Sequence, residues 1–242
     1  MGSNALELKA EDGIVRAILN RPERGNALNE STVEALISAI EEASRTHTRV
    51  FILKGAGRHF CTGFDLPEYG ADDAHLLHRL VRIETMLQLV YRAPFLTIGV
   101  AHGRTFGAGA DLFAACDRRI TLSDARFAFP GAGFGILLGT RRLCERVGAD
   151  AARQLVRTGH TIDAAEALKI NLANLSSTPD EANALIEAEM QIAIDGSTLR
   201  GLNHVTLQGD DDKALADLVR SASRPGLAAR LVAYREKIKA SK

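Results

Sequence analysis

The sequence has no excess of charge of either sign. Lys plus Arg and Asp plus Glu each number 30 among 242 residues, so the formal net charge is zero. Such a chain has no overall field to attract nucleic acid or an anionic membrane, and we expect neither as a partner. Any anionic ligand must be held by local groups.

Long apolar runs and cysteines are also scarce. No run approaches the roughly 20 residues of a membrane-spanning helix, and the N-terminus lacks the basic, apolar and small-residue sections of a signal peptide. The three cysteines, Cys61, Cys116 and Cys144, are odd in number and lack metal-ligand spacing. These absences predict a cytoplasmic, globular protein with reduced thiols and no metal.

Three common motifs are missing although glycines cluster at residues 103–111 and 131–135. A phosphate loop needs Gly-Lys followed by Ser or Thr, which does not occur. The dinucleotide fingerprint needs a glycine at position 112, which is leucine, and the second cluster also misses that pattern. No serine is framed as a Gly-x-Ser-x-Gly nucleophile elbow. A nicotinamide oxidoreductase is therefore disfavoured.

Hydrophobic periodicity predicts alternating strands and helices. We expect a hairpin over residues 6–19 with its turn at Asp12-Gly13, a helix capped by Asn29, and a helix over 73–92. Short strands are expected at 50–53, 96–100, 119–122 and 126–129, with helices from about residue 136 onward. This order predicts an α/β core over residues 1–178 and a helical C-terminal region over 179–242.

The glycine segment from Gly103 to Asp111 carries the first chemical signal. It follows a buried strand directly and leads into a helix, so it exposes unpaired N–H groups beside small residues at Gly107, Ala108 and Gly109. An oxygen that gains negative charge would be stabilised there, next to the carboxyl group of Asp111. The alternative is that the glycines only permit tight packing and that Asp111 complements the helix dipole.

A second loop, residues 57–65, follows the strand at 50–53 in the same way. In a parallel sheet both loops emerge at the carboxyl ends of strands, where α/β folds bind ligands. Two N–H groups, one from each loop, could then hold one oxygen atom.

The ordered motifs resemble those of the crotonase superfamily, the enoyl-CoA hydratase and isomerase proteins. Asn20-Arg-Pro-Glu23 and Asn26-Ala-Leu-Asn29 resemble its first coenzyme A loop, and Phe60-Cys-Thr-Gly-Phe-Asp65 its first oxyanion segment. Ala93 to Gly103, Gly107 to Leu112 and Ala115-Cys-Asp117 resemble the second. The likeness covers residues 5 to 175 and recurs in the last helix.

The resemblance implies a crotonase-like spiral of ββα-type units, a C-terminal region that packs in trimers or dimers of trimers, and acyl-CoA thioester substrates without a further cofactor. It implies that the N–H groups of Phe64 and Ala108 form the oxyanion hole and that Asp111 is an acid/base. Residues implied around the substrate are Arg24, Gly25, Ala27, Leu28, Thr62, Gly63, Asp65, Leu66, Gly107 and Gly131.

The sequence departs from the family at its two expected glutamates. The first position is Asp111, which is one methylene shorter, and the second falls on Gly131, which has no titratable group. No Asp or Glu lies between Asp124 and Glu145, so a shifted alignment cannot restore the second acid. Ordinary two-acid hydration is therefore in doubt, while a proton shift, a Claisen or aldol cleavage, or a decarboxylation can pass through an enolate with one acid.

Two hypotheses stay open: an enzyme that uses Asp111 alone, and a non-catalytic relative that binds acyl-CoA or serves as an oligomeric partner. In related synthases with glycine at the second position, bicarbonate serves as the base, but the rest of their pattern is not evident here. Other candidate groups, each with a structural alternative, are His75, His78, Tyr91, His102, Cys61, Lys237 and Lys239.

Overall fold

The computed structural model of the protein describes residues 5–66, 72–178, 181–191, 194–207 and 209–240. Its elements in chain order are β1 (Leu6–Glu11), β2 (Ile14–Leu19), η1 (Pro22–Arg24), α1 (Glu30–Arg45), β3 (Val50–Gly55), α2 (Asp73–Tyr91), β4 (Leu96–Ala101), β5 (Arg104–Phe106), α3 (Ala108–Ala115), β6 (Arg118–Leu122), β7 (Arg126–Ala128), η2 (Pro130–Phe134), α4 (Thr140–Val147), α5 (Ala149–Thr158), β8 (Ile162–Asp163), α6 (Ala164–Lys169), β9 (Leu175–Ser177), α7 (Ala182–Met190), α8 (Gly196–Thr206), α9 (Asp211–Ala222) and α10 (Leu227–Ala240).

The main sheet has six strands in the order β1-β2-β3-β4-β6-β9. The β1–β2 pair is the predicted antiparallel hairpin, and both turn residues, Asp12 and Gly13, have the positive φ that a tight two-residue turn requires. The other neighbours are parallel. Because β3 and β4 pair in parallel, their carboxyl ends meet at one edge, as predicted from the two loops.

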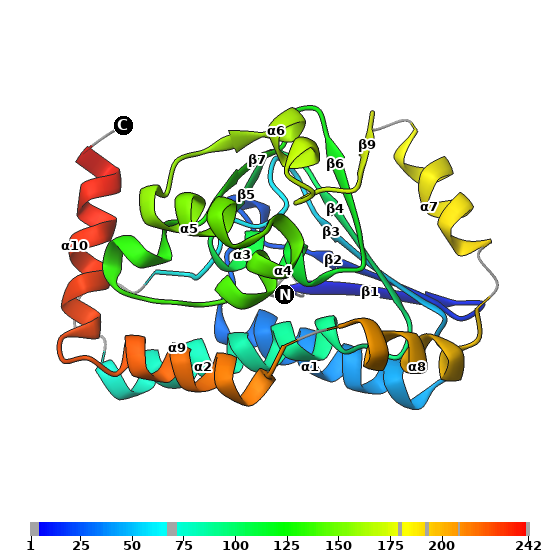
Figure 1. Cartoon of the computed structure of the whole chain (residues 1–242), viewed down its shortest axis with the longest axis horizontal. Coiled ribbons are helices and arrows are strands. Elements are labelled where there is room, and N and C mark those ends of the chain that lie inside the picture. Colours follow the sequence, from blue (N-terminus) through cyan, green and yellow to red (C-terminus); the bar gives the residue numbers. More distant parts are fainter. Residues whose placement is uncertain (1–4, 67–71, 179–180, 192–193, 208, 241–242) are drawn as a thin grey trace.

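Each face of this sheet is covered by helices. Phe51 and Leu53 of β3 pack in one apolar cluster with α1 and α2, whereas Val50 and Ile52 pack on the opposite face with Ile186 of α7. The alternation follows from the two-residue period of a strand. Figure 1 shows α1, α2, α8 and α9 along one side of the molecule and α7 and α10 at opposite ends.

The predicted helix starts at α1 and α2 are confirmed. The side chain of Asn29 accepts from the N–H of Thr32 at the start of α1, and Asp72 accepts from the N–H of His75 at the start of α2. A side-chain oxygen at this position satisfies one of the free N–H groups at a helix start.

Three short strands correct the expected pattern. Residues 104–106, expected as part of a plain turn, form β5 in a second, three-stranded sheet of order β5-β7-β8. The region after residue 136, expected to be wholly helical, contains β8 and β9. Strands of two or three residues are too short to show alternation, and their pairing partners lie far along the chain.

The last helix, α10, is fixed to α2 by a cap from a distant residue. The N–H groups of Gly226, Leu227 and Ala228 donate to the carboxylate of Asp73, over 3.0, 3.1 and 2.7 Å. These contacts hold the pKa of Asp73 below its usual value. The C-terminal segment therefore returns to the core and does not trail away from it.

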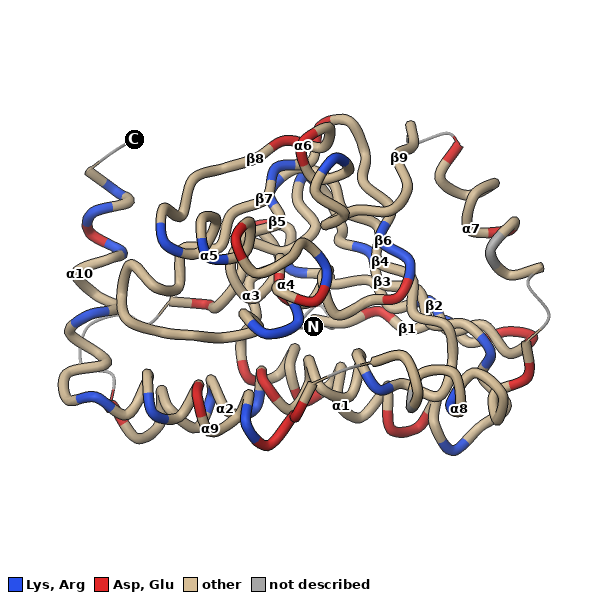
Figure 2. The backbone as a smooth tube through the Cα atoms, viewed as in Figure 1, with Lys and Arg blue, Asp and Glu red and all other residues tan. Residues whose placement is uncertain are grey.

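The predicted boundary after residue 178 adjoins residues 179–180, which lie outside the described part of the chain. Figure 2 shows acidic and basic residues interspersed along the helices and loops, in keeping with the zero net charge. Within the described ranges, no helix combines the length and apolar character that crossing a bilayer requires.

Candidate active site

A mainly apolar cavity of about 140 Å³ lies between the loop at residues 62–66, the start of α3, the η2 loop and α10. Eight of the predicted site residues line it: Thr62, Gly63, Phe64, Leu66, Gly107, Ala108, Asp111 and Gly131. The structure thus brings together residues from two loops that are more than 40 positions apart.

The N–H group of Phe64 faces away from Leu28, the residue paired with it in an isolated bridge. Leu28 donates to the carbonyl of Gly63 over 2.8 Å, and the N–H of Asp65 donates to Leu28 over 3.1 Å, which makes a parallel bridge between Leu28 and Phe64. In such a bridge, the residue between the two hydrogen bonds is Phe64, and its N–H group points away from Leu28. Among the described residues, no acceptor takes the Phe64 N–H.

The N–H group of Ala108 also has no acceptor among the described residues, for a different reason. Ala108 is the first residue of α3, where the helix has no internal acceptor for it. A Cβ on Gly63 would stand 3.3 Å from the Ala108 nitrogen, so the residue before Phe64 lies against this amide. Gly63 and Gly107 have φ values of 97° and 52°, which favour glycine.

The Phe64 ring is covered by a cation. The Arg79 guanidinium of α2 lies 4.4 Å from the ring centroid and donates to the carbonyl of Asp65 over 3.0 Å. Arg79 thus contacts Phe64 and the next residue together. Its cation is attracted to the face of the Phe64 ring, and its hydrogen bond holds the Asp65 carbonyl.

Asp111, in the first turn of α3, is 4% exposed, and its Oδ1 has no hydrogen-bond partner among the described residues. Burial raises the pKa of this carboxyl well above its usual value; the nearby charge of Arg142 lowers it and that of Glu84 raises it. The backbone of Gly139 packs against the carboxyl: a Cβ there would stand 2.7 Å from the Asp111 Cβ. A carboxyl group in this setting favours its protonated form.

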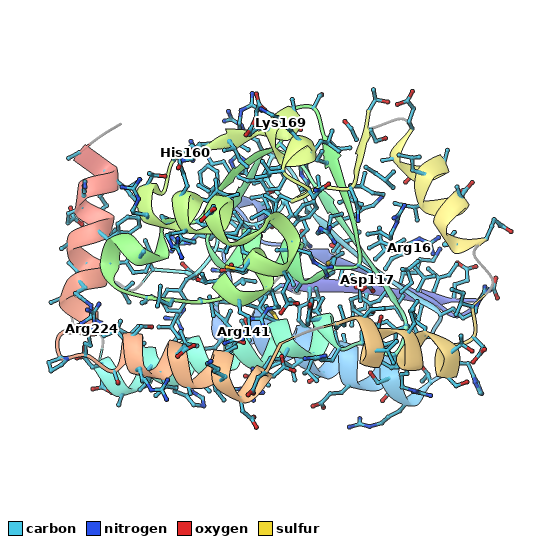
Figure 3. The ribbon with its side chains drawn as sticks, in the orientation of Figure 1. Arg16, Asp117, Arg141, His160, Lys169 and Arg224 are labelled. Carbon is cyan, nitrogen blue, oxygen red and sulfur yellow. The ribbon has the colours of Figure 1, made fainter. Side chains whose placement is uncertain are left out.

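Glu84 and Arg142 form a buried ion pair that the sequence analysis missed. Their side chains are 1% and 3% exposed, and Arg142 Nη2 lies 2.6 Å from Glu84 Oε2. One feature of the sequence could have indicated that Glu84 is buried: it lies beside the apolar stripe of α2, next to Ile83. The sequence gives no such signal for Arg142, because the adjacent Arg141 has the same chemistry but is only partly buried and lies 3.9 Å from Asp217 of α9 (Figure 3).

Gly131 lies in η2, which turns back tightly on itself. The N–H of Ile136 donates to the Gly131 carbonyl over 2.9 Å, and a Cβ on Gly131 would stand 2.9 Å from the Ile136 carbonyl oxygen. The loop thus has no space for an ordinary side chain here without moving. Arg224, before α10, holds the same loop by donating to Gly135 over 3.1 Å (Figure 3).

The predicted coenzyme A loop lies next to the predicted oxyanion loop and outside the cavity wall. Thr62 donates its N–H to Gly25 over 3.0 Å, and Ala27 and Leu28 are buried. The Asp65 carboxylate lies 3.4 Å from the half-exposed Arg24 and 3.0 Å from Arg21. Arg24 therefore stays at the surface beside this loop.

The histidine candidates lie away from the cavity wall. His75 and His78 are exposed on α2, where His75 contacts Glu30. His102 is within hydrogen-bonding distance of the Gly57 carbonyl, at 3.0 Å. These contacts support the structural alternative for each.

Cys61 and Tyr91 are also held in structural contacts. Burial raises the pKa of the Cys61 thiol to about 12, so it is not a reactive thiolate. Tyr91 donates to Glu145, and its pKa is raised by burial and by that contact. Of the lysine candidates, Lys239 pairs with Glu236 over 3.0 Å at the end of α10.

The last helix contributes to the cavity in a way that its sequence did not reveal. Tyr234 and Ile238 of α10 line the wall, and the Tyr234 ring lies 4.5 Å from that of Phe134 at 47°. Burial raises the pKa of Tyr234. The C-terminal region, predicted mainly for oligomerisation, therefore also lines this cavity.

Comparisons with known proteins agree with the geometry. A profile of the Enoyl-CoA hydratase/isomerase family matches residues 9–185. The chain is 36% identical over 180 residues to the "Probable enoyl-CoA hydratase echA6" of Mycobacterium leprae, covering 72% of this chain and 71% of that protein.

Solved structures share the whole fold. A Bordetella parapertussis protein assigned as an enoyl-CoA hydratase/isomerase superposes with a TM-score of 0.93 at 41% identity, covering 96% of this chain and 98% of that one. An enoyl-CoA hydratase/isomerase from Xanthobacter autotrophicus Py2 gives 0.81 at 27%, covering 98% and 95%. The crotonase-like fold is confirmed, and the chain belongs to the enoyl-CoA hydratase/isomerase family.

Proposed function

We propose that the protein is an acyl-CoA enzyme that stabilises a thioester enolate between the N–H groups of Phe64 and Ala108, with Asp111 as its single acid/base. The observation that carries this proposal concerns the described residues: two amides to which they offer no acceptor, and a buried carboxyl oxygen to which they offer no partner, share one apolar cavity.

The two amides suit an oxygen that becomes charged during the reaction. In a cavity with little water, fixed N–H dipoles stabilise a developing oxyanion without reorganising, and one such donor is worth about 3 kcal/mol. Ala108 adds the partial positive charge of a helix start. The thioester carbonyl oxygen would take this place.

Gly131 decides between the reactions open to this site. Among the described residues that line the cavity, Asp111 has the only carboxyl group and η2 supplies none, so reactions that need one proton transfer to or from an enolate fit better than hydration. The same observation supports the alternative, a non-catalytic relative that binds acyl-CoA. Coenzyme A enters only as part of the substrate, and we propose no other cofactor.

The cavity favours a compact acyl group. Its volume of about 140 Å³ is close to the roughly 150 Å³ of an engineered apolar cavity that binds one benzene molecule. Phe134, Tyr234 and Leu138 are among the side chains that line this space. We therefore propose acyl groups of about the size of one ring and not long fatty chains.

Turnover and binding assays test this proposal. Thioesters that react through an enolate, including crotonyl-CoA, a 3-enoyl-CoA and malonyl-CoA, are incubated with the wild type and with Asp111→Asn. We expect turnover of at least one thioester, a loss of about 100-fold or more in Asp111→Asn, and no change in Asp150→Asn, whose side chain is fully exposed.

Three other outcomes would change the proposal. Full activity in Asp111→Asn would refute the acid/base role. Tight acyl-CoA binding without any turnover would favour the non-catalytic alternative. Thermal stabilisation by NADH and not by coenzyme A would contradict both.

We also propose that residues 179–242 mediate assembly into trimers or dimers of trimers. Apolar side chains at Ile194, Leu202 and Val205, in and beside α8, are 40%, 45% and 75% exposed, more than a monomer needs. Light scattering of the purified protein measures the mass directly, and a monomer at micromolar concentration would contradict this assignment.

A further inference from the structure

Three ionisable side chains are buried together at the cavity wall, where Asp111 lines the cavity and the other two lie behind it. Asp111 comes from α3, Glu84 from α2 and Arg142 from α4, and each is nearly inaccessible to solvent. The group contains two carboxyls and one cation. If all three were ionised, the buried group would carry one net negative charge, and an unpaired buried charge is strongly disfavoured.

The single cation is already committed to Glu84. Arg142 donates to one oxygen of Glu84 over 2.6 Å, and the other oxygen of that carboxylate accepts from Gln88 over 3.1 Å. Within the described residues, Arg142 Nε and Asp111 Oδ1 have no hydrogen-bond partner. Asp111 therefore lies beside the ion pair without belonging to it.

The described residues around Asp111 supply no cation besides Arg142. Arg142 and Glu84 are the charged side chains that act on it. The other elements around the cavity contribute Thr140 at the start of α4, Gly131 in η2 and Tyr234 on α10 to its lining, and the tyrosine is neutral at ordinary pH. A proton on Asp111 is the simplest way to balance the charge.

From this arrangement we infer that Glu84 and Arg142 are positioning residues that keep Asp111 in its neutral acid form, so that the resting site donates a proton to an enolate. The inference rests on the proposed function and deepens it. Asp111 then begins the catalytic cycle as an acid, and the enolate must arise without a base.

Loss of CO₂ from a thioester with a carboxylate on its α carbon meets that condition. The bond between the α carbon and the carboxylate breaks, and its electron pair moves into the thioester to form the enolate, whose oxygen lies between the Phe64 and Ala108 amides. The proton of Asp111 passes to the α carbon, and Asp111 regains a proton from water. A neutral Asp111 also avoids repelling the substrate carboxylate. The structure therefore assigns malonyl-type thioesters as the substrate class.

Infrared spectroscopy of the free enzyme tests the protonation state without any turnover. We expect the carbonyl stretching band of a buried protonated carboxyl in the wild type at pH 7 and its loss in Asp111→Asn. In Glu84→Gln the band should also disappear, because Arg142 becomes free to pair with an ionised Asp111. The control Glu166→Gln, in a partly exposed surface pair, should keep it.

Absence of the band in the wild type, or its persistence in a folded Glu84→Gln protein, would overturn the inference. If circular dichroism shows that Glu84→Gln does not fold, the wild-type band is titrated instead. Its disappearance at high pH and its absence from Asp111→Asn would support the assignment, and a band shared by both proteins would refute it.

A pH profile then separates this inference from the proposed function. Release of CO₂ from malonyl-CoA should fall as pH rises, because an acid is lost by deprotonation. Turnover of crotonyl-CoA or a 3-enoyl-CoA that rises with pH, without malonyl-CoA turnover, would overturn the inference and leave the proposed function standing. Failure to bind any acyl-CoA would overturn the proposed function and the substrate class together.

Discussion

Replacing Gly109 by alanine should misplace the oxyanion donors without harming the helix that contains one of them. Gly109 is the second residue of α3, and a Cβ there would stand 2.8 Å from both the Cβ and the carbonyl carbon of Cys61, with the carbonyl oxygen closer still. Carbon atoms in contact need about 3.5 Å. The loop and the helix start must therefore separate by roughly 0.7 Å or more.

The expected effect is a fall in kcat of about 100-fold, because a displacement of about 1 Å of a positioned group has that cost. Overpacking of a tight contact should lower the free energy of unfolding by about 1–3 kcal/mol, partly offset by about 1 kcal/mol from the better helix propensity of alanine.

Turnover and thermal unfolding are measured for Gly109→Ala beside a matched control. The control is Gly133→Ala in η2, where a Cβ meets no atom within 4 Å and φ is not positive. The control should keep wild-type kcat. Wild-type kcat in Gly109→Ala would show that the contact between α3 and the loop of Cys61 does not set the donor geometry.

Three further outcomes follow from the same site. Burial raises the pKa of Asp111 in the folded state, so above about pH 3.9 the unfolded chain loses this proton while the folded protein keeps it. The free energy of unfolding should therefore fall with rising pH, by about 1.4 kcal/mol for each unit by which the pKa is raised. Denaturant unfolding of Asp111→Asn should lack that part of the slope. Gly131→Glu should not create crotonyl-CoA hydration, because its Cβ would crowd the Ile136 carbonyl; a gain in hydratase rate would contradict this. Tyr234→Ala should enlarge the cavity and improve the affinity for a decanoyl thioester over a butyryl thioester about tenfold, as read by calorimetric titration.

The elements with strong local signals were predictable from the sequence. The hairpin, the capped start of α1, the helix α2, and the buried strands β3 and β4 each depend on residues that are close together along the chain. Because β3 and β4 are parallel neighbours, the loops that follow them were also predicted to meet. The short strands β5, β8 and β9 were missed because only distant partners define them.

The environment of Asp111 was beyond sequence reasoning. Arg141 and Arg142 are adjacent and chemically identical, yet Arg141 is only partly buried, beside Asp217, and Arg142 is fully buried with Glu84. Which of the two arginines is buried depends on how α4 packs against α2 and α3. The helix is too short for its hydrophobic periodicity to predict this. The roles of Phe64, Ala108 and Asp111 remain predictions that the geometry supports.

The hydrogen bonds between Leu28 and the two residues that flank Phe64 have a mechanical consequence. They join the surface loop expected to hold the nucleotide end of the substrate to the amide expected to hold its carbonyl oxygen. Binding of the nucleotide end to the surface loop can thereby hold the Phe64 amide more rigidly. Binding energy from a remote part of the substrate would then help to lower the reaction barrier. A truncated thioester that keeps only the acyl end would fit the same cavity, but it would not contact the surface loop and would not stiffen the Phe64 amide.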